Sequence, residues 1–308
     1  MKNYIPKIKQ RVMREWKDKK NIPFKVNRDI HRFLMTHSKN PRPGSFPYVS
    51  GDSFRELAQH IFDEISIVHP EKVKSDDIIF VGTHFIEEFF KKIHPLIKAH
   101  YKLITHNSDN HITSDLLKYI DDKIIHWYAQ NVKVSHPKIT PIPYGLENLH
   151  FYTNGNTSII KKEQEREQRE RQNKILFGFS VSTNPGERQP ALDNLLKTKL
   201  AEKISGWPNA WKYLKILNSY KFVAAPPGNG IDSPREWQAL YLGVVPVVKR
   251  SIMTEYFRSL GLPMWLIDDW GELRDLDAHD LEKKYHDLTK DANTESLYLN
   301  YWIKKIKQ

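Results

Sequence analysis

One segment, residues 222–248 ("FVAAPPGNGIDSPREWQALYLGVVPVV"), constrains the fold of this chain more than any other. It places an apolar run, a glycine-containing loop, a helical stretch and a second apolar run in succession, the pattern of a strand–helix–strand unit. Such a unit joins two parallel strands by a right-handed crossover in nearly all proteins. Its first loop therefore lies at the carboxyl end of a parallel strand, where open α/β sheets bind ligands.

The residues of this loop and helix suit that position. Gly228 and Gly230 allow positive φ angles and a close approach of the backbone to a ligand. Ser233 and Glu236 have the spacing of a capping box, and Gly243 is placed to end the helix in a left-handed conformation. A stable strand-to-helix turn accounts for all of these features, so we assign Glu236 to capping.

Arg235 is not required by the turn. The first N–H groups of a helix have no partner within the helix and lie at the positive end of its dipole, so they bind phosphate readily. A guanidinium group at the same place matches phosphate oxygens. We predict that Arg235 binds an anionic group and that Arg188, in "TNPGERQP", is a second cation at the same site. The alternative for Arg188 is a helix-start charge pair with Glu187.

The rest of the chain alternates between strand-length apolar runs and helical stretches, which favours parallel sheets in an α/β protein. We predict strands beginning near residues 78, 101, 123, 138, 174, 221 and 244, and helices over 85–100, 114–120 and 191–204. The stretch "KKEQEREQRERQ", residues 161–172, has no apolar position and is typical of an exposed helix or linker. These patterns predict an N-terminal domain (1–160), a charged linker (161–173) and a C-terminal domain (174–308), whose final helix is a candidate to pack back on the first.

The composition narrows the function classes. The net charge of +11 favours an anionic partner, but the basic residues do not form a stripe interleaved with aromatics, so we expect no nucleic-acid partner. The chain has no cysteine, which excludes disulfides and thiolate sites, and no apolar run approaches the ~20 residues of a membrane span. We expect a cytoplasmic protein. Its basic termini are either a solvated surface or a weak peripheral contact with a membrane.

The segment 219–273 resembles the donor-binding motif of exostosin-like (GT47-type) glycosyltransferases. The shared features are a strand ending in proline, "GNGID", a small residue–x–Arg helix start, "ALYLG" and the following "LPMWLIDDWGEL". "LITHNSD" and "PIPYGLEN", within residues 78–148, are similar to elements of bacterial and large algal-virus members. The resemblance implies a GT-B fold: two Rossmann-like domains face each other across a cleft, with the nucleotide sugar on the C-terminal domain and a glycan acceptor on the other.

The resemblance also implies a set of donor-binding residues and no cofactor or metal. Carried onto this sequence, with the second cation, the set is Arg188, Gly228, Asn229, Gly230, Ser233, Arg235 and Gln238. Many members have a glutamate that accepts hydrogen bonds from the donor's ribose, where this chain has Gln238. An amide oxygen still accepts from a hydroxyl but without charge assistance, which leaves donor affinity and donor identity open.

An inverting transferase needs a base for the acceptor hydroxyl, and three loops of the N-terminal half offer one. Asp109 is our preferred candidate, followed by His106 and His84, with Glu147 as a further choice. The structural alternatives are a turn residue for Asp109 and a buried, hydrogen-bonded imidazole for His84. The D-x-D pattern at residues 275–277 is common by accident, so we expect no metal site there.

These observations predict a metal-independent, inverting glycosyltransferase with a UDP-type donor. The sugar we expect is xylose, with galactose next, and it is moved to a hydroxyl of a glycan. Three alternatives stay open: a retaining GT-B transferase, a glycan-binding protein without activity, and a nucleic-acid-binding protein that uses the basic surface.

Overall fold

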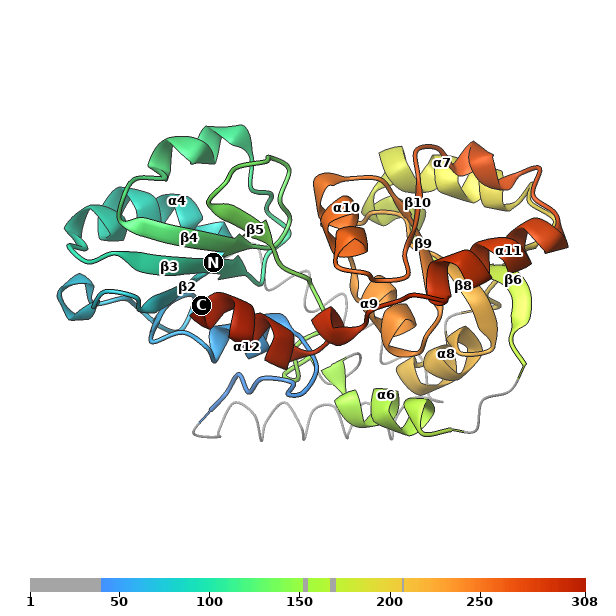
Figure 1. Ribbon diagram of the computed structural model, residues 1–308, viewed down its shortest axis with the longest axis horizontal. Helices are drawn as coiled ribbons and strands as arrows, with labels where there is room; N and C mark the ends of the chain where they lie inside the picture. The colour runs from blue at the N-terminus through green and yellow to red at the C-terminus, as the bar shows by residue number, and fades with distance from the viewer. Residues whose placement is uncertain (1–39, 152–154, 167–169, 207) are drawn as a thin grey trace, which may run out of the picture.

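The computed structural model describes residues 40–151, 155–166, 170–206 and 208–308. These residues form two parallel sheets of five strands each, one in each half of the chain, with helices around both (Figure 1). The chain is therefore an α/β protein with one parallel, Rossmann-like sheet in each half, as the sequence predicted. No helix in the described ranges has both the length and the apolar character needed to cross a membrane.

The first sheet follows the order of the chain, β1-β2-β3-β4-β5. Its strands are β1 (His60–Phe62), β2 (Ile78–Gly82), β3 (Tyr101–His106), β4 (Ile124–Ala129) and β5 (Ile139–Pro141). All residues of β2 and β3 are buried, as expected for strands covered on both faces. The four strands predicted near residues 78, 101, 123 and 138 are confirmed. The edge strand β1 was not predicted.

The connections of this domain are short and irregular. Helix α3 (Gly51–Arg55) precedes β1, and a 3-10 helix spans Ser114–Tyr119 where a short helix was expected. The predicted helix over 85–100 is broken into α4 (Ile86–Glu88), a π turn (Phe89–Ile93) and a 3-10 turn (His94–Leu96). Pro95 has no N–H to donate, which limits regular helix at this place.

The second sheet has the order β10-β9-β8-β6-β7. Its strands are β6 (Gln172–Phe177), β7 (Ala201–Lys203), β8 (Tyr220–Ala224), β9 (Val245–Lys249) and β10 (Trp265–Ile267). The helices of this half are α6 (Thr157–Gln164), α7 (Pro185–Leu195), α8 (Ala210–Leu217), α9 (Pro234–Tyr241), α10 (Ile252–Ser259) and α11 (Ala278–Thr289). The unit β8–α9–β9 is the predicted strand–helix–strand unit, with Phe222 opposite Val245.

Two predictions for this half are wrong. The helix expected over 191–204 ends with α7 at Leu195, and residues 201–203 instead form the edge strand β7 beside β6. Pairing with β6 satisfies backbone groups along that edge, which overrides the helical pattern of the segment. In the linker, Glu163 is buried on α6 and accepts a hydrogen bond from Arg166 Nη1 at 3.0 Å, so this stretch is not wholly exposed.

The last helix, α12 (Leu299–Lys307), lies against the first sheet (Figure 1). Lys102 Nζ donates to Ile306 O at 2.7 Å, and the Tyr128 hydroxyl donates to Lys305 O at 3.0 Å. The lysines of the C-terminal segment are therefore carried by a helix that packs on the N-terminal half. The basic segment 1–20 lies outside the described residues.

Candidate functional site

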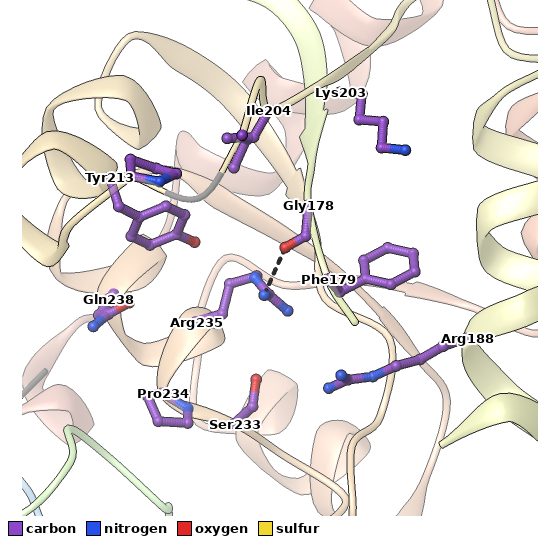
Figure 2. A pocket seen from close by; sticks show the side chains of 12 residues that line it. Gly178, Phe179, Arg188, Lys203, Ile204, Tyr213, Ser233, Pro234, Arg235 and Gln238 are labelled. Atoms are coloured by element: carbon purple, nitrogen blue, oxygen red, sulfur yellow. Dashed lines mark hydrogen bonds between the residues drawn. The ribbon is translucent and has the colours of Figure 1, made fainter. Parts of the chain in front are cut away.

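A cavity of about 570 Å³ lies at the carboxyl ends of the strands of the second sheet and at the start of α9. Figure 2 shows the side chains around it. It is lined by Gly178, Phe179, Arg188, Lys203, Ile204, Gly206, Pro208, Tyr213, Ser233, Pro234, Arg235 and Gln238. Four of the predicted site residues, Arg188, Ser233, Arg235 and Gln238, therefore meet at one cavity.

Arg235, on the first turn of α9, is held to the end of β6. Its Nη2 donates to Gly178 O at 2.8 Å, whereas its Nε is buried and has no hydrogen-bond partner. In Figure 2 its guanidinium group lies between Gly178 and Ser233 and faces the open space. A buried donor without a partner costs free energy, so this end of the guanidinium group lowers the stability of the chain as it stands.

Arg188, on α7, is 7% exposed and binds only main-chain oxygens. Its Nε donates to Pro227 O and its Nη1 to Ser180 O, both at 2.9 Å. Within the described residues no carboxylate lies within salt-bridge distance of Arg188 or Arg235, so the proposed pair with Glu187 does not form. Burial, and then the positive charge of Arg235, lower the pKa of Arg188.

The start of α9 differs from the predicted capping box. The Ser233 hydroxyl caps no backbone N–H of the helix, and it lies 3.4 Å from Glu236 Oε1. Glu236 is 1% exposed rather than a surface capping residue. At the other end of the helix, Gly243 adopts the predicted left-handed conformation, with φ 69°. The Ser233 hydroxyl is therefore hydrogen-bonded to the Glu236 carboxyl group instead of capping the helix, and it lines the cavity.

Gly228 and Gly230 do not adopt positive φ angles, so that part of the prediction is wrong. Neither glycine lines this cavity, and their contact with a donor stays a prediction. Their lack of a side chain serves contacts within the protein. A Cβ at Gly228 would lie 2.9 Å from Arg188 Nη2, and one at Gly230 would lie 2.8 Å from Asn131 Oδ1. The glycines thus allow Arg188 and Asn131 to pack against the loop.

Asn131, which sequence reasoning missed, joins the two domains at this loop. It is fully buried with φ 56°, its Oδ1 accepts from Ile231 N at 2.9 Å, and its Nδ2 donates to Ser108 O at 3.0 Å. A second link runs from Tyr144 N to Asp232 Oδ2 at 2.8 Å. The sequence signal for Asn131 is weak, since asparagine tolerates left-handed φ in any turn.

Asp109 lies beside the loop before α9. Its Oδ2 accepts from Asn229 Nδ2 at 3.1 Å, and its side chain is exposed. This contact brings the preferred base and the predicted donor-binding Asn229 together at the junction of the domains. Asn229 does not line the cavity.

The two histidine candidates are differently placed. His106 is 2% exposed, its Nδ1 accepts from Asn107 N at 2.6 Å, and its Nε2 bonds to Pro143 O at 3.0 Å. Burial lowers the pKa of His106 to about 4. Because both ring nitrogens of His106 are hydrogen-bonded inside the protein, the imidazole is not placed to take a proton from the hydroxyl of a glycan acceptor. His84 is exposed and packs on the Phe85 ring, so its expected alternative as a buried histidine is wrong.

One group in the described chain has metal-ligand geometry: Asp277, His279 and Asp280, all exposed. Asp277 caps α11 by accepting from Asp280 N at 2.8 Å, and Asp280 accepts from Asp277 N. Asp277, the last residue of the D-x-D pattern, therefore caps a helix, and the expected absence of a metal stays a prediction.

No protein-family model matches the chain, and no curated protein matches it in sequence. Similar solved structures include the spinosyn rhamnosyltransferase SpnG complexed with thymidine diphosphate (TM-score 0.35, 11% identity, 75% of this chain and 68% of that chain). They also include an alpha,alpha-trehalose-phosphate synthase (UDP-forming) from Burkholderia vietnamiensis (TM-score 0.43, 9% identity, 76% and 73%) and TarM (TM-score 0.39, 14% identity, 75% and 55%). TM-scores below 0.5 carry no argument about function, so the exostosin-like resemblance of residues 219–273 stays a prediction.

Proposed function

We propose that this chain is a glycosyltransferase that binds a nucleotide sugar in the cavity at the start of α9 and moves the sugar to a glycan hydroxyl. The observation that carries the proposal is the convergence of Arg188 and Arg235 on one cavity with no carboxylate partner in the described residues. Arg188 is buried and Arg235 is partly buried, so their positive charges repel each other, and a bound diphosphate would relieve that repulsion. The first N–H groups of α9 add a positive dipole end at the same place.

The same geometry supports roles for the neighbouring residues. Gln238, 5% exposed on α9, lines the cavity and offers an amide to the donor. Asp109, next to Asn229, is our proposed base for the acceptor hydroxyl, which makes the reaction inverting. We infer a UDP donor carrying xylose, with galactose next, from the resemblance of the motif. Because two guanidinium groups and a helix start supply the positive charge, the proposal requires no metal.

Nucleotide binding is the first test. Thermal unfolding followed with UDP, GDP and CMP should show a rise in Tm with UDP, since a ligand that binds only the folded state stabilises it. Arg235→Ala and Arg188→Ala should each abolish the rise. Arg250→Ala is the matched control: it removes an exposed arginine that is paired with Asp268, and should leave the rise unchanged. Equal shifts in Arg235→Ala and the native chain would exclude the diphosphate site.

Turnover is the second test. Incubation with an array of nucleotide sugars, scored for released UDP, identifies the donor without knowledge of the acceptor. We expect release from UDP-xylose, insensitivity to EDTA, and a loss of about 10²–10⁴-fold in Asp109→Asn with UDP affinity unchanged. A glycan-binding protein without activity would release no UDP. A nucleic-acid-binding protein would instead show salt-sensitive binding of DNA or RNA and indifference to UDP.

A further inference from the structure

The first turn of α9 holds a carboxyl group without a cationic partner. Glu236 is 1% exposed, its Oε2 has no hydrogen-bond partner, and its Oε1 is hydrogen-bonded at 3.4 Å to Ser233 Oγ, which is the donor when the carboxyl group is ionised. The ionisable groups that face it are Asp232 from the preceding loop, Arg235 from its own helix and Arg188 from α7. No salt bridge links Glu236 to either arginine among the described residues.

An ionised carboxylate is costly in this setting. A buried charge without a paired ion or a full set of hydrogen bonds loses its hydration and gains little in return, and such a group keeps its proton instead. Burial, and then the charge of Asp232, raise the pKa of Glu236 well above its ordinary value, while Arg235 lowers it by less. The neutral acid is the form that this geometry favours.

The protonation state of Glu236 determines whether the Ser233 hydroxyl can donate a hydrogen bond to a ligand. A serine hydroxyl has one hydrogen to donate, and an ionised Glu236 would take it because a carboxylate only accepts. Ser233 would then present lone pairs to an anionic ligand. If Glu236 is neutral, its own O–H donates to Ser233 Oγ, and the serine hydrogen is free. The Ser233 hydroxyl is available for this because it caps no backbone N–H of α9 and lines the cavity.

We propose that Glu236 is a positioning residue that donates its proton to Ser233 Oγ, so that the Ser233 hydroxyl donates to a phosphate oxygen in the cavity. This inference rests on the proposed function, because it takes the ligand to be a nucleoside diphosphate. A neutral Glu236 has a second consequence. It leaves the positive charges of Arg188 and Arg235 undiminished, whereas an ionised carboxylate beneath them would weaken their attraction for the diphosphate.

UDP affinity measured by titration calorimetry at pH 7 tests the relay. Glu236→Gln is nearly isosteric, and its amide N–H can donate to Ser233 Oγ as the neutral acid does. We expect its dissociation constant to stay within about twofold of the native value. Ser233→Ala should weaken UDP by about tenfold or more, the value of one hydrogen bond to a charged group, in both the native and the Glu236→Gln background.

A Glu236→Gln variant that binds UDP at least tenfold more tightly would overturn the proposal, since that gain means that a negative charge was removed. An unchanged affinity in Ser233→Ala would also overturn it. The infrared difference spectrum between the native chain and Glu236→Gln gives an independent readout: it should contain the carbonyl band of a protonated carboxylic acid, and a carboxylate band in its place would exclude the neutral form.

The same measurements separate this inference from the proposed function. If the native chain does not bind UDP, or if Arg235→Ala binds it normally, the donor site itself is wrong. If UDP binds and Arg235→Ala loses it, but Glu236→Gln tightens binding, only the relay fails.

Discussion

Two buried polar clusters lie near the junction of the domains, and they differ in how well their atoms are satisfied. In the first, Asp52 at the start of α3 is fully buried, and its two carboxylate oxygens accept three side-chain hydrogen bonds. The donors are Arg42 Nε at 3.0 Å, Asn107 Nδ2 at 3.1 Å and His150 Nδ1 at 2.9 Å. Burial alone would raise the pKa of Asp52, but hydrogen bonds from His150 and Arg42 hold it below its ordinary value. This cluster is complete without a ligand.

In the second cluster, around the start of α9, several buried atoms have no partner. They are Arg235 Nε, Glu236 Oε2, Asp232 Oδ1 and the hydroxyl oxygen of Tyr213. Most buried polar groups in folded proteins are paired, and exceptions gather where a ligand or a proton supplies the missing contact. The contrast indicates that the Asp52 cluster stabilises the fold, whereas the start of α9, the proposed ligand site, leaves buried atoms unpaired.

The largest effect should come from breaking the complete cluster. Asp52→Ala removes the carboxylate that Arg42 and His150 share, and removal of one partner of a buried ion pair costs about 3–5 kcal/mol, with the lower end expected because Arg42 keeps Glu64. Urea denaturation should show this loss in the free energy of unfolding. Asp268→Ala, which removes an exposed carboxylate paired with Arg250, is the control and should cost less than about 1 kcal/mol. A small loss in Asp52→Ala would contradict the structural role.

His106, adjacent to Asn107 of that cluster, should make the fold sensitive to acid. The pKa of His106 in the folded chain is about 4, below the ordinary 6.5. The contribution of the neutral imidazole to the free energy of unfolding is therefore complete above pH 6.5 and is lost as the pH falls towards 4. The shift corresponds to about 3 kcal/mol. The native chain should lose stability between pH 7 and pH 4, and in His106→Gln this loss should be smaller by about the same amount. The exposed His84→Gln should lose as much stability as the native chain. Identical acid sensitivity in His106→Gln would place the effect elsewhere.

Local patterns predicted much of this molecule, and contacts between distant segments account for what they missed. The unit β8–α9–β9 was predictable because its apolar runs, glycines and Pro234 act over a few residues. Asn131 and Ile231 are 100 residues apart in the chain, and Tyr144 and Asp232 are 88 apart, so no local pattern indicates that they meet. The position of Arg235 was predictable from the helix start. The burial of Glu236 was not, since the spacing of a capping box is the same whether or not the box forms.

The smallest predicted effect tests the incomplete cluster and has the opposite sign. Asp232 is 3% exposed, and burial raises its pKa to about 6 from the ordinary 3.8. Its contribution to the free energy of unfolding is therefore complete below pH 3.8 and is lost as the pH rises through 6. At pH 8 the ionised carboxylate is therefore destabilising. Asp232→Asn keeps an oxygen that accepts from Tyr144 N and Trp237 Nε1 but removes the charge.

We expect Asp232→Asn to raise the free energy of unfolding at pH 8 by about 1 kcal/mol. This is less than the full pKa shift of Asp232 implies, because the new amide N–H₂ group takes the place of the unpartnered Oδ1 and is itself a buried group without a partner. At pH 4 the gain should vanish. Urea denaturation at both pH values measures the difference, with the exposed Asp268→Asn as control. A loss of stability at pH 8 would show that the carboxylate is satisfied in the folded chain and that the two clusters do not differ as described. A gain confined to alkaline pH, opposite to the acid sensitivity of His106, would show that the unpaired carboxylate of Asp232 lowers stability at the start of α9, the proposed ligand site.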